Sequence, residues 1–215
     1  MKKHIYILTV ILLSVCTSGH LYAQQNVESD IKAIRDLYSK AQEFIKHDKE
    51  DPTIEYQVTL SLKRHHTVEG HVTYDYHFYF RWDGQDGYSG SPVLKFVRVK
   101  ITDRAGSSQE EYLFNDKEDL VFYFTKFKEG GVGNDMEIRL YYKNGERIRE
   151  LIKQTDKITK KVTERNSINV LYATEVEHPL STVKIVKSLF RAAMSHTNPN
   201  DSEHEGPIRN IDGAW

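Results

Sequence analysis

The sequence predicts an α+β fold: an N-terminal helix, an antiparallel meander of about six to seven strands, and a C-terminal helix packed on one face. Apolar residues recur at three- and four-residue steps near both ends of the chain, which is typical of amphipathic helices. Between them, apolar and polar residues alternate, which is typical of half-buried strands. Because the strands follow one another without intervening helices, an antiparallel sheet is favoured over a parallel one.

The first 23 residues have the features of a secretory signal peptide. Lys2 and Lys3 form a positive start, and residues 5–15 are an apolar or small run that is too short to span a bilayer. We predict cleavage after Ala23 and export to the periplasm or the cell surface. The alternative is a lipid anchor at Cys16, although the residue before it is branched rather than small.

Composition limits the classes of partner. The chain has 30 basic and 31 acidic residues, so it lacks the positive charge expected of a nucleic-acid-binding protein. Its single cysteine lies in the signal, so the exported domain has no disulfide, which is more typical of a bacterial envelope protein than of a eukaryotic secreted one. No apolar stretch after the signal approaches transmembrane length. We expect one α+β domain over residues 24–196 and a flexible polar tail over residues 197–215.

The first predicted helix runs from Val27 to His47, before Pro52. One apolar stripe contains Val27, Ile31, Ile34, Leu37, Tyr38, Ala41, Phe44 and Ile45. The second helix is predicted from Ser181 to Met194, after Pro179. Both helices are expected to cover the same apolar face of the sheet.

Two alternating segments, residues 54–66 and 71–82, predict the first hairpin. Their even positions are apolar and their odd positions are mostly polar. Because opposed residues of an antiparallel pair share a face, the apolar positions must be paired with one another. The predicted pairs are Tyr56 with Phe80, Val58 with Phe78, Leu60 with Tyr76, Leu62 with Tyr74, Glu55 with Arg81, and His65 with His71.

Further strands are predicted over residues 93–102, 110–114, 120–127 and 136–143. Asn144-Gly145 predicts a type I′ hairpin turn after the last of these. A regular two-residue hairpin would pair Arg139 with Glu150, Tyr141 with Ile148 and Ile138 with Leu151. The charged segment 154–169 is left open between a loop, a helix and an edge strand.

No residue is predicted to be catalytic, because the motifs of serine, cysteine and zinc hydrolases are missing from the sequence. The candidate ligand-binding residues lie on the polar face of the first hairpin and in the glycine-rich segment after it. They are His71, Asp75, His77, Tyr79, Trp82 and Tyr88. Histidine, aspartate and exposed aromatic side chains suit contact with a peptide or a glycan.

No cofactor is predicted, but two metal hypotheses stay open. His65, His71 and Asp75 offer imidazole and carboxylate ligands of the kind that zinc prefers. His71 and His77 are about 20 Å apart along a strand, too far to share one ion. Asp83 and Asp86 offer carboxylates for calcium in the loop 83–92, which lacks the acidic ladder of an EF-hand.

Several segments resemble small uncharacterised exported proteins of Bacteroidota. They are the signal ending Ala-Gln-Gln, the helix at residues 30–38, and the segments 111–116, 119–124 and 141–145. This resemblance covers most of residues 24–195 and implies a periplasmic or surface location with no known activity. The first helix also resembles those of nuclear-transport-factor-2-like domains. We therefore expect a non-enzymatic envelope module that binds a protein, peptide or glycan; the alternative is a metal-dependent or hydrolytic enzyme using the histidine and aspartate cluster.

Overall fold

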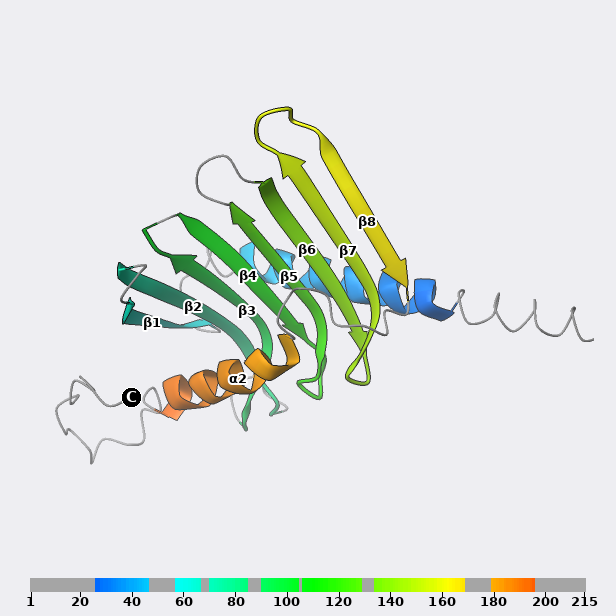
Figure 1. Cartoon of the computed structure of the whole chain (residues 1–215). Coiled ribbons are helices and arrows are strands. Elements are labelled where there is room, and N and C mark those ends of the chain that lie inside the picture. Colours follow the sequence, from blue (N-terminus) through cyan, green and yellow to red (C-terminus); the bar gives the residue numbers. More distant parts are fainter. Residues whose placement is uncertain are drawn as a thin grey trace, which may run out of the picture.

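An eight-stranded antiparallel sheet forms the centre of the computed structural model, with two helices packed against it (Figure 1). The strands lie side by side in sequence order, so the sheet is a simple meander. The predicted α+β class is confirmed, with more strands than the six to seven expected. The structure describes residues 26–46, 57–66, 70–84, 90–104, 106–128, 134–168 and 179–195.

The elements are bounded as follows. The N-terminal helix covers residues 26–46. The strands are β1 (Gln57–His66), β2 (Gly70–Trp82), β3 (Pro92–Thr102), β4 (Ser107–Phe114), β5 (Leu120–Lys128), β6 (Asn134–Lys143), β7 (Glu146–Asp156) and β8 (Val162–Ile168). The C-terminal helix is α2 (Pro179–Ser195). The segment that the sequence left open is therefore the end of β7, a turn and the edge strand β8.

The register of the first hairpin is confirmed for every predicted pair that the structure describes. Leu62 lies opposite Tyr74, Leu60 opposite Tyr76, Val58 opposite Phe78, and His65 opposite His71. The predicted partners at positions 55 and 56 lie outside the described residues. Matching the apolar faces was therefore sufficient to set this register.

The second predicted hairpin has the expected turn but a different register. Asn144 and Gly145 both have positive φ, 52° and 79°, as a type I′ turn requires. A bulge between Tyr141 and Tyr142 then shifts the pairing by one residue, so that Tyr141 faces Arg149 and Arg139 faces Leu151. The pairs predicted beyond the turn are wrong because an extra residue in one strand is not visible in the turn sequence.

The two helices lie on opposite faces of the sheet, which corrects the prediction that they share one face. Figure 1 shows α2 in front of the lower ends of the first strands and the N-terminal helix behind the sheet. Phe190 of α2 packs on Phe78 and Phe80, with ring centroids 5.7 and 5.6 Å apart. Tyr38 of the N-terminal helix instead packs on Phe96 and Phe122.

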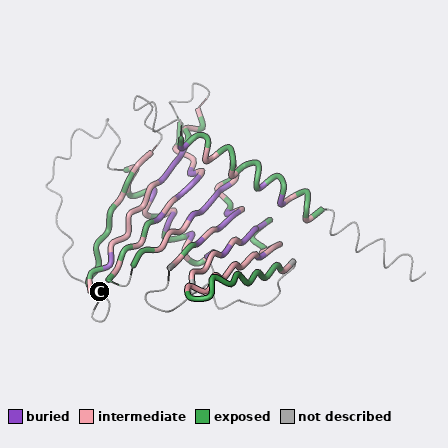
Figure 2. The backbone as a smooth tube through the Cα atoms, turned by 90° about the horizontal axis from the view of Figure 1, so that it is seen from above, coloured by how far each residue is buried: buried purple, intermediate pink, exposed green. Residues whose placement is uncertain are grey.

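Each helix completes a separate apolar core. On the α2 face the buried residues are Phe78, Phe80, Leu94, Val97, Val99, Tyr112, Phe114, Leu120, Tyr123, Ile138, Leu140, Tyr142, Val183, Val186 and Phe190. On the face of the N-terminal helix they are Ile31, Ile34, Ile45, Tyr79, Phe96, Leu113, Phe122 and Tyr141. The buried residues gather on the central strands (Figure 2). These strands are therefore apolar on both sides, like strands covered on both faces.

Ion pairs fix the start of the N-terminal helix over the later strands. Lys143 Nζ lies 2.7 Å from Asp30 Oδ2, and Arg149 Nη1 lies 3.0 Å from Glu28 Oε1. Leu37 and Phe44, which were placed on the apolar stripe, are 37% and 40% exposed. Among the helices that the structure describes, none combines the length and apolar character needed to cross a membrane.

Candidate functional site

A cleft of about 390 Å³ lies between the N-terminal helix and the sheet. One wall is the helix, and the other is formed by neighbouring positions of β5 and β6. The residues that line it are Ile34, Arg35, Tyr38, Ser39, Phe122, Phe124, Arg139 and Tyr141. Its volume falls in the lower part of the range of small-molecule sites, about 300–1,000 Å³.

The sheet wall of the cleft is built from two cross-strand pairs. Phe122 faces Tyr141 and Phe124 faces Arg139. The rings of Phe122 and Tyr141 have centroids 5.1 Å apart, and the ring of Tyr38 meets Phe122 edge-on at 5.2 Å. Such edge-on contacts are the preferred geometry of aromatic pairs. The aromatic rings of this wall therefore pack against one another, which limits how far their side chains can move into the cleft.

A buried carboxylate holds Tyr38 in place. The Tyr38 hydroxyl donates to Glu111 Oε2 at 2.6 Å, while Arg98 Nε and Gln109 Nε2 donate to Oε1 at 2.9 and 2.8 Å. Glu111 is only 2% exposed, and Arg98 also donates to Gln42 of the helix at 3.1 Å. Burial, and then the hydrogen bond to Glu111, raises the pKa of Tyr38 well above its usual value. The tyrosine therefore stays neutral and acts as a fixed donor.

Two arginines line the cleft, each against an aromatic ring. Arg35 Cζ lies 5.9 Å from the ring centroid of Tyr141, and Arg139 Cζ lies 5.6 Å from that of Phe124. No Asp or Glu is among the lining residues that the structure describes. The cleft therefore combines apolar walls with positive charge, which favours an anionic ligand with an apolar part.

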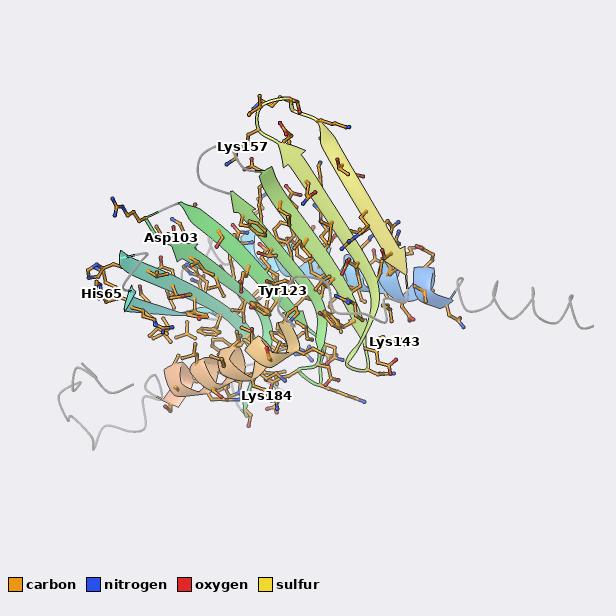
Figure 3. All side chains as sticks on the ribbon, in the orientation of Figure 1. His65, Asp103, Tyr123, Lys143, Lys157 and Lys184 are labelled. Carbon is orange, nitrogen blue, oxygen red and sulfur yellow. The ribbon has the colours of Figure 1, made fainter. Side chains whose placement is uncertain are left out.

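The opposite face of the sheet, on which α2 packs, holds a second polar cluster. The hydroxyl of Tyr112 donates to Glu110 Oε2 at 2.5 Å, and the Tyr112 and Tyr123 ring centroids are 5.1 Å apart. Burial raises the pKa of Glu110, while hydrogen bonds from Tyr112 and Tyr123 act against this rise. Figure 3 shows Tyr123 near the middle of the sheet, above α2. These groups satisfy one another within an apolar core.

An ion-pair triad lies further along the α2 face. Glu150 is 1% exposed and lies 3.0 Å from Arg147 and 2.9 Å from Arg165. Arg165 is on the edge strand β8, so this triad ties β8 to β7 through a buried carboxylate. A buried carboxylate needs such partners because desolvation of an unpaired charge is strongly unfavourable. We assign the triad a structural role.

The predicted histidine and aspartate residues share the sheet face of the N-terminal helix but do not converge. The rings of His65 and His71 are 5.0 Å apart at an exposed edge. Asp75 accepts a hydrogen bond from Ser61 at 2.6 Å, and His77 Nδ1 lies 3.1 Å from Gln57 Nε2. Within the described part of the chain, no three His, Cys, Asp or Glu residues lie close enough to hold a metal ion.

The predicted aromatic candidates lie in three different environments. Tyr79 is only 3% exposed and packs 6.0 Å from Phe96, which contradicts the expectation that its face is polar and open. Trp82 is half-buried on the α2 face, 5.7 Å from Phe80. Tyr88 lies outside the described residues, as do Asp86, the predicted signal and the predicted tail.

Sequence reasoning missed the cleft because it treated one face of the sheet as solvated. The available signal was the run Leu120–Phe124, in which apolar residues occupy successive positions and so point to both faces. A second signal was Tyr141-Tyr142 at the end of β6. Neither signal identifies Arg35 or Arg139, whose positions depend on where the helix crosses the strands.

Comparisons with known proteins give no relative. No family model matches the chain, and neither a curated protein nor a solved structure is significantly similar to it.

Proposed function

We propose that this chain is an exported, non-enzymatic binding protein of the cell envelope that holds a glycan or peptide ligand in the cleft between its N-terminal helix and its sheet. The observation that carries the proposal is the cleft itself, with aromatic walls and two arginines and no acid among its described lining residues. A concave, mostly apolar site with a few polar groups is the usual form of a ligand site. The predicted signal peptide supports export.

The rigidity of the cleft favours binding. Tyr38 is fixed by its hydrogen bond to Glu111, and the helix is tied to the strands by ion pairs at Asp30 and Glu28. A site that is already ordered loses less conformational entropy when its ligand binds. The same packing offers no nucleophile held beside a general base among the lining residues that the structure describes.

The test is a pair of tryptophan variants on the helix. Ser39 is exposed and lines the cleft, so Ser39→Trp is expected to fill it and abolish binding to immobilised glycans or peptides. Lys32 is exposed on the same helix outside the lining set, so Lys32→Trp is the matched control and is expected to bind like the wild type. Both variants should melt within a few degrees of the wild type.

Two results would contradict the proposal. Equal binding by Ser39→Trp and the wild type would place the ligand elsewhere. Turnover of hydrolase substrates by the purified protein, lost in His71→Ala, would support the enzymatic alternative instead.

Export is tested by the mass of the protein recovered from the envelope. Cleavage after Ala23 predicts a chain that begins at Gln24. A chain that begins at Cys16 and carries acyl groups would establish the lipid anchor. A full-length chain found in the cytoplasm would contradict the proposed location.

A further inference from the structure

Each arginine of the cleft lies beside an aromatic ring of the sheet wall. Arg139 lies over Phe124 at 5.6 Å, and Arg35 lies over Tyr141 at 5.9 Å. A guanidinium is attracted to the face of a nearby aromatic ring, and its forked N–H groups can donate to both oxygens of one carboxylate. Both side chains therefore lie at the cleft with donor groups suited to a planar, bidentate acceptor.

The positive charge around these arginines is only partly balanced. Glu137 Oε2 lies 3.1 Å from Arg139, but Oε1 of the same carboxylate lies 2.9 Å from Lys126. One carboxylate is thus shared between two cations. Arg35 makes no ion pair with any residue that the structure describes. A carboxylate ligand would supply the missing negative charge.

We infer that the cleft binds a carboxylate held beside a six-membered ring. The guanidinium groups of Arg35 and Arg139 contact the carboxylate, while the ring packs against the apolar walls at Ile34 and Phe122. A uronic acid of a glycan and the carboxylate of a peptide that ends in an aromatic residue share this chemistry. The inference rests on the proposed function and specifies the ligand class for the same cleft.

The experiment is an NMR titration of the purified protein that follows the Nε–H signals of Arg35 and Arg139. The probes are glucuronate and phenylacetate, each with its neutral counterpart, glucose or phenylacetamide. At least one carboxylate is expected to shift both signals, with its neutral counterpart binding at least about tenfold more weakly. Affinity should fall as salt is raised, because the attraction is between charges near the surface. The carboxylate that binds identifies the source of the ligand.

Charge-removing variants test the assignment residue by residue. Arg35→Gln and Arg139→Gln are each expected to weaken carboxylate binding about tenfold or more, the scale of one hydrogen bond to a charged group. Arg139→Lys keeps the charge but loses the planar fork, so its loss should be intermediate. Arg104→Gln removes an exposed charge outside the cleft and should bind like the wild type.

Two outcomes overturn the inference: neither carboxylate binds, or the two glutamine variants bind like the wild type. If the carboxylates fail while Ser39→Trp still blocks binding to an immobilised glycan or peptide, this inference falls and the proposed function stands. If Ser39→Trp binds every probe as well as the wild type does, both this inference and the proposed function are wrong.

Discussion

The hydrogen bond from Tyr38 to Glu111 is expected to make a large contribution to the attachment of the N-terminal helix. Tyr38→Phe removes one hydroxyl and keeps the ring that packs 5.2 Å from Phe122. Glu111 Oε2 would lose its 2.6 Å donor at a site where the residue is 2% exposed. Hydrogen bonds to charged groups contribute about 1.5–3 kcal/mol, so we expect a loss of about 2 kcal/mol in the free energy of unfolding.

Equilibrium urea unfolding at pH 7 measures this loss. With a slope of about 2 kcal/mol per molar urea, the midpoint should fall by about 1 M. Tyr74→Phe is the control, because Tyr74 is half-buried and its hydroxyl has no hydrogen-bond partner among the residues that the structure describes. Its midpoint should change by less than about 0.3 M.

A double-mutant cycle with Glu111→Gln isolates the pair. Because the two side chains are in direct contact, the double variant should lose at least about 1 kcal/mol less than the sum of the single losses. Additive losses, or a Tyr38→Phe variant within about 0.5 kcal/mol of the wild type, would refute the claim that this contact fixes the helix.

Three further predictions concern the sheet and α2. Phe190→Ala should lower the free energy of unfolding by about 3–5 kcal/mol, because Phe190 is fully buried, whereas Ile185→Ala on the exposed side of α2 should stay within about 0.5 kcal/mol; chemical denaturation measures both. Gly145→Ala should lower the free energy of unfolding by about 1 kcal/mol, because Gly145 has a φ of 79°, and Gly90→Ala should lower it more, because Gly90 has a φ of 89° and the new Cβ would overlap a neighbouring carboxylate. Thermal melting that ranks the two variants in the reverse order would contradict this prediction. Burial raises the pKa of Glu110 above its ordinary value of 4.5, so the folded state holds the proton more tightly than the unfolded state and the wild type loses stability as pH rises through the raised pKa. Glu110→Gln should therefore become more stable relative to the wild type over that pH interval, and a stability difference that stays constant with pH would be inconsistent with the shift.

The elements of the fold could be predicted because each has a local signal. Apolar spacing located both helices, and alternation set the pairing of His65 with His71 across the first hairpin. The Asn144-Gly145 turn followed from the preference of that pair for positive φ. The bulge between Tyr141 and Tyr142 did not follow, because no turn residue marks an extra residue within a strand.

The sides on which the helices pack could not be predicted from alternation alone. Tyr79 lies on the face with Asp75 and His77, and the polarity of those neighbours hid its burial. The N-terminal helix packs on Phe96, which also contacts Tyr79, whereas Asp75 and His77 bond to polar residues of β1. The same face of β2 is therefore apolar at Tyr79 and polar at Asp75 and His77. The cleft depends on where the helix crosses the strands, and for that reason Arg35 and Arg139 could not be brought together from sequence spacing.

The central claim is that the cleft between the N-terminal helix and the sheet is the ligand site. The most direct test is a crystal structure of the protein grown with whichever of glucuronate and phenylacetate binds in the NMR titration. We expect density for this ligand between the helix and the sheet, with its carboxylate within hydrogen-bond distance of Arg35 and Arg139. Density for the ligand on another surface, with both guanidinium groups left without a ligand contact, would contradict the claim.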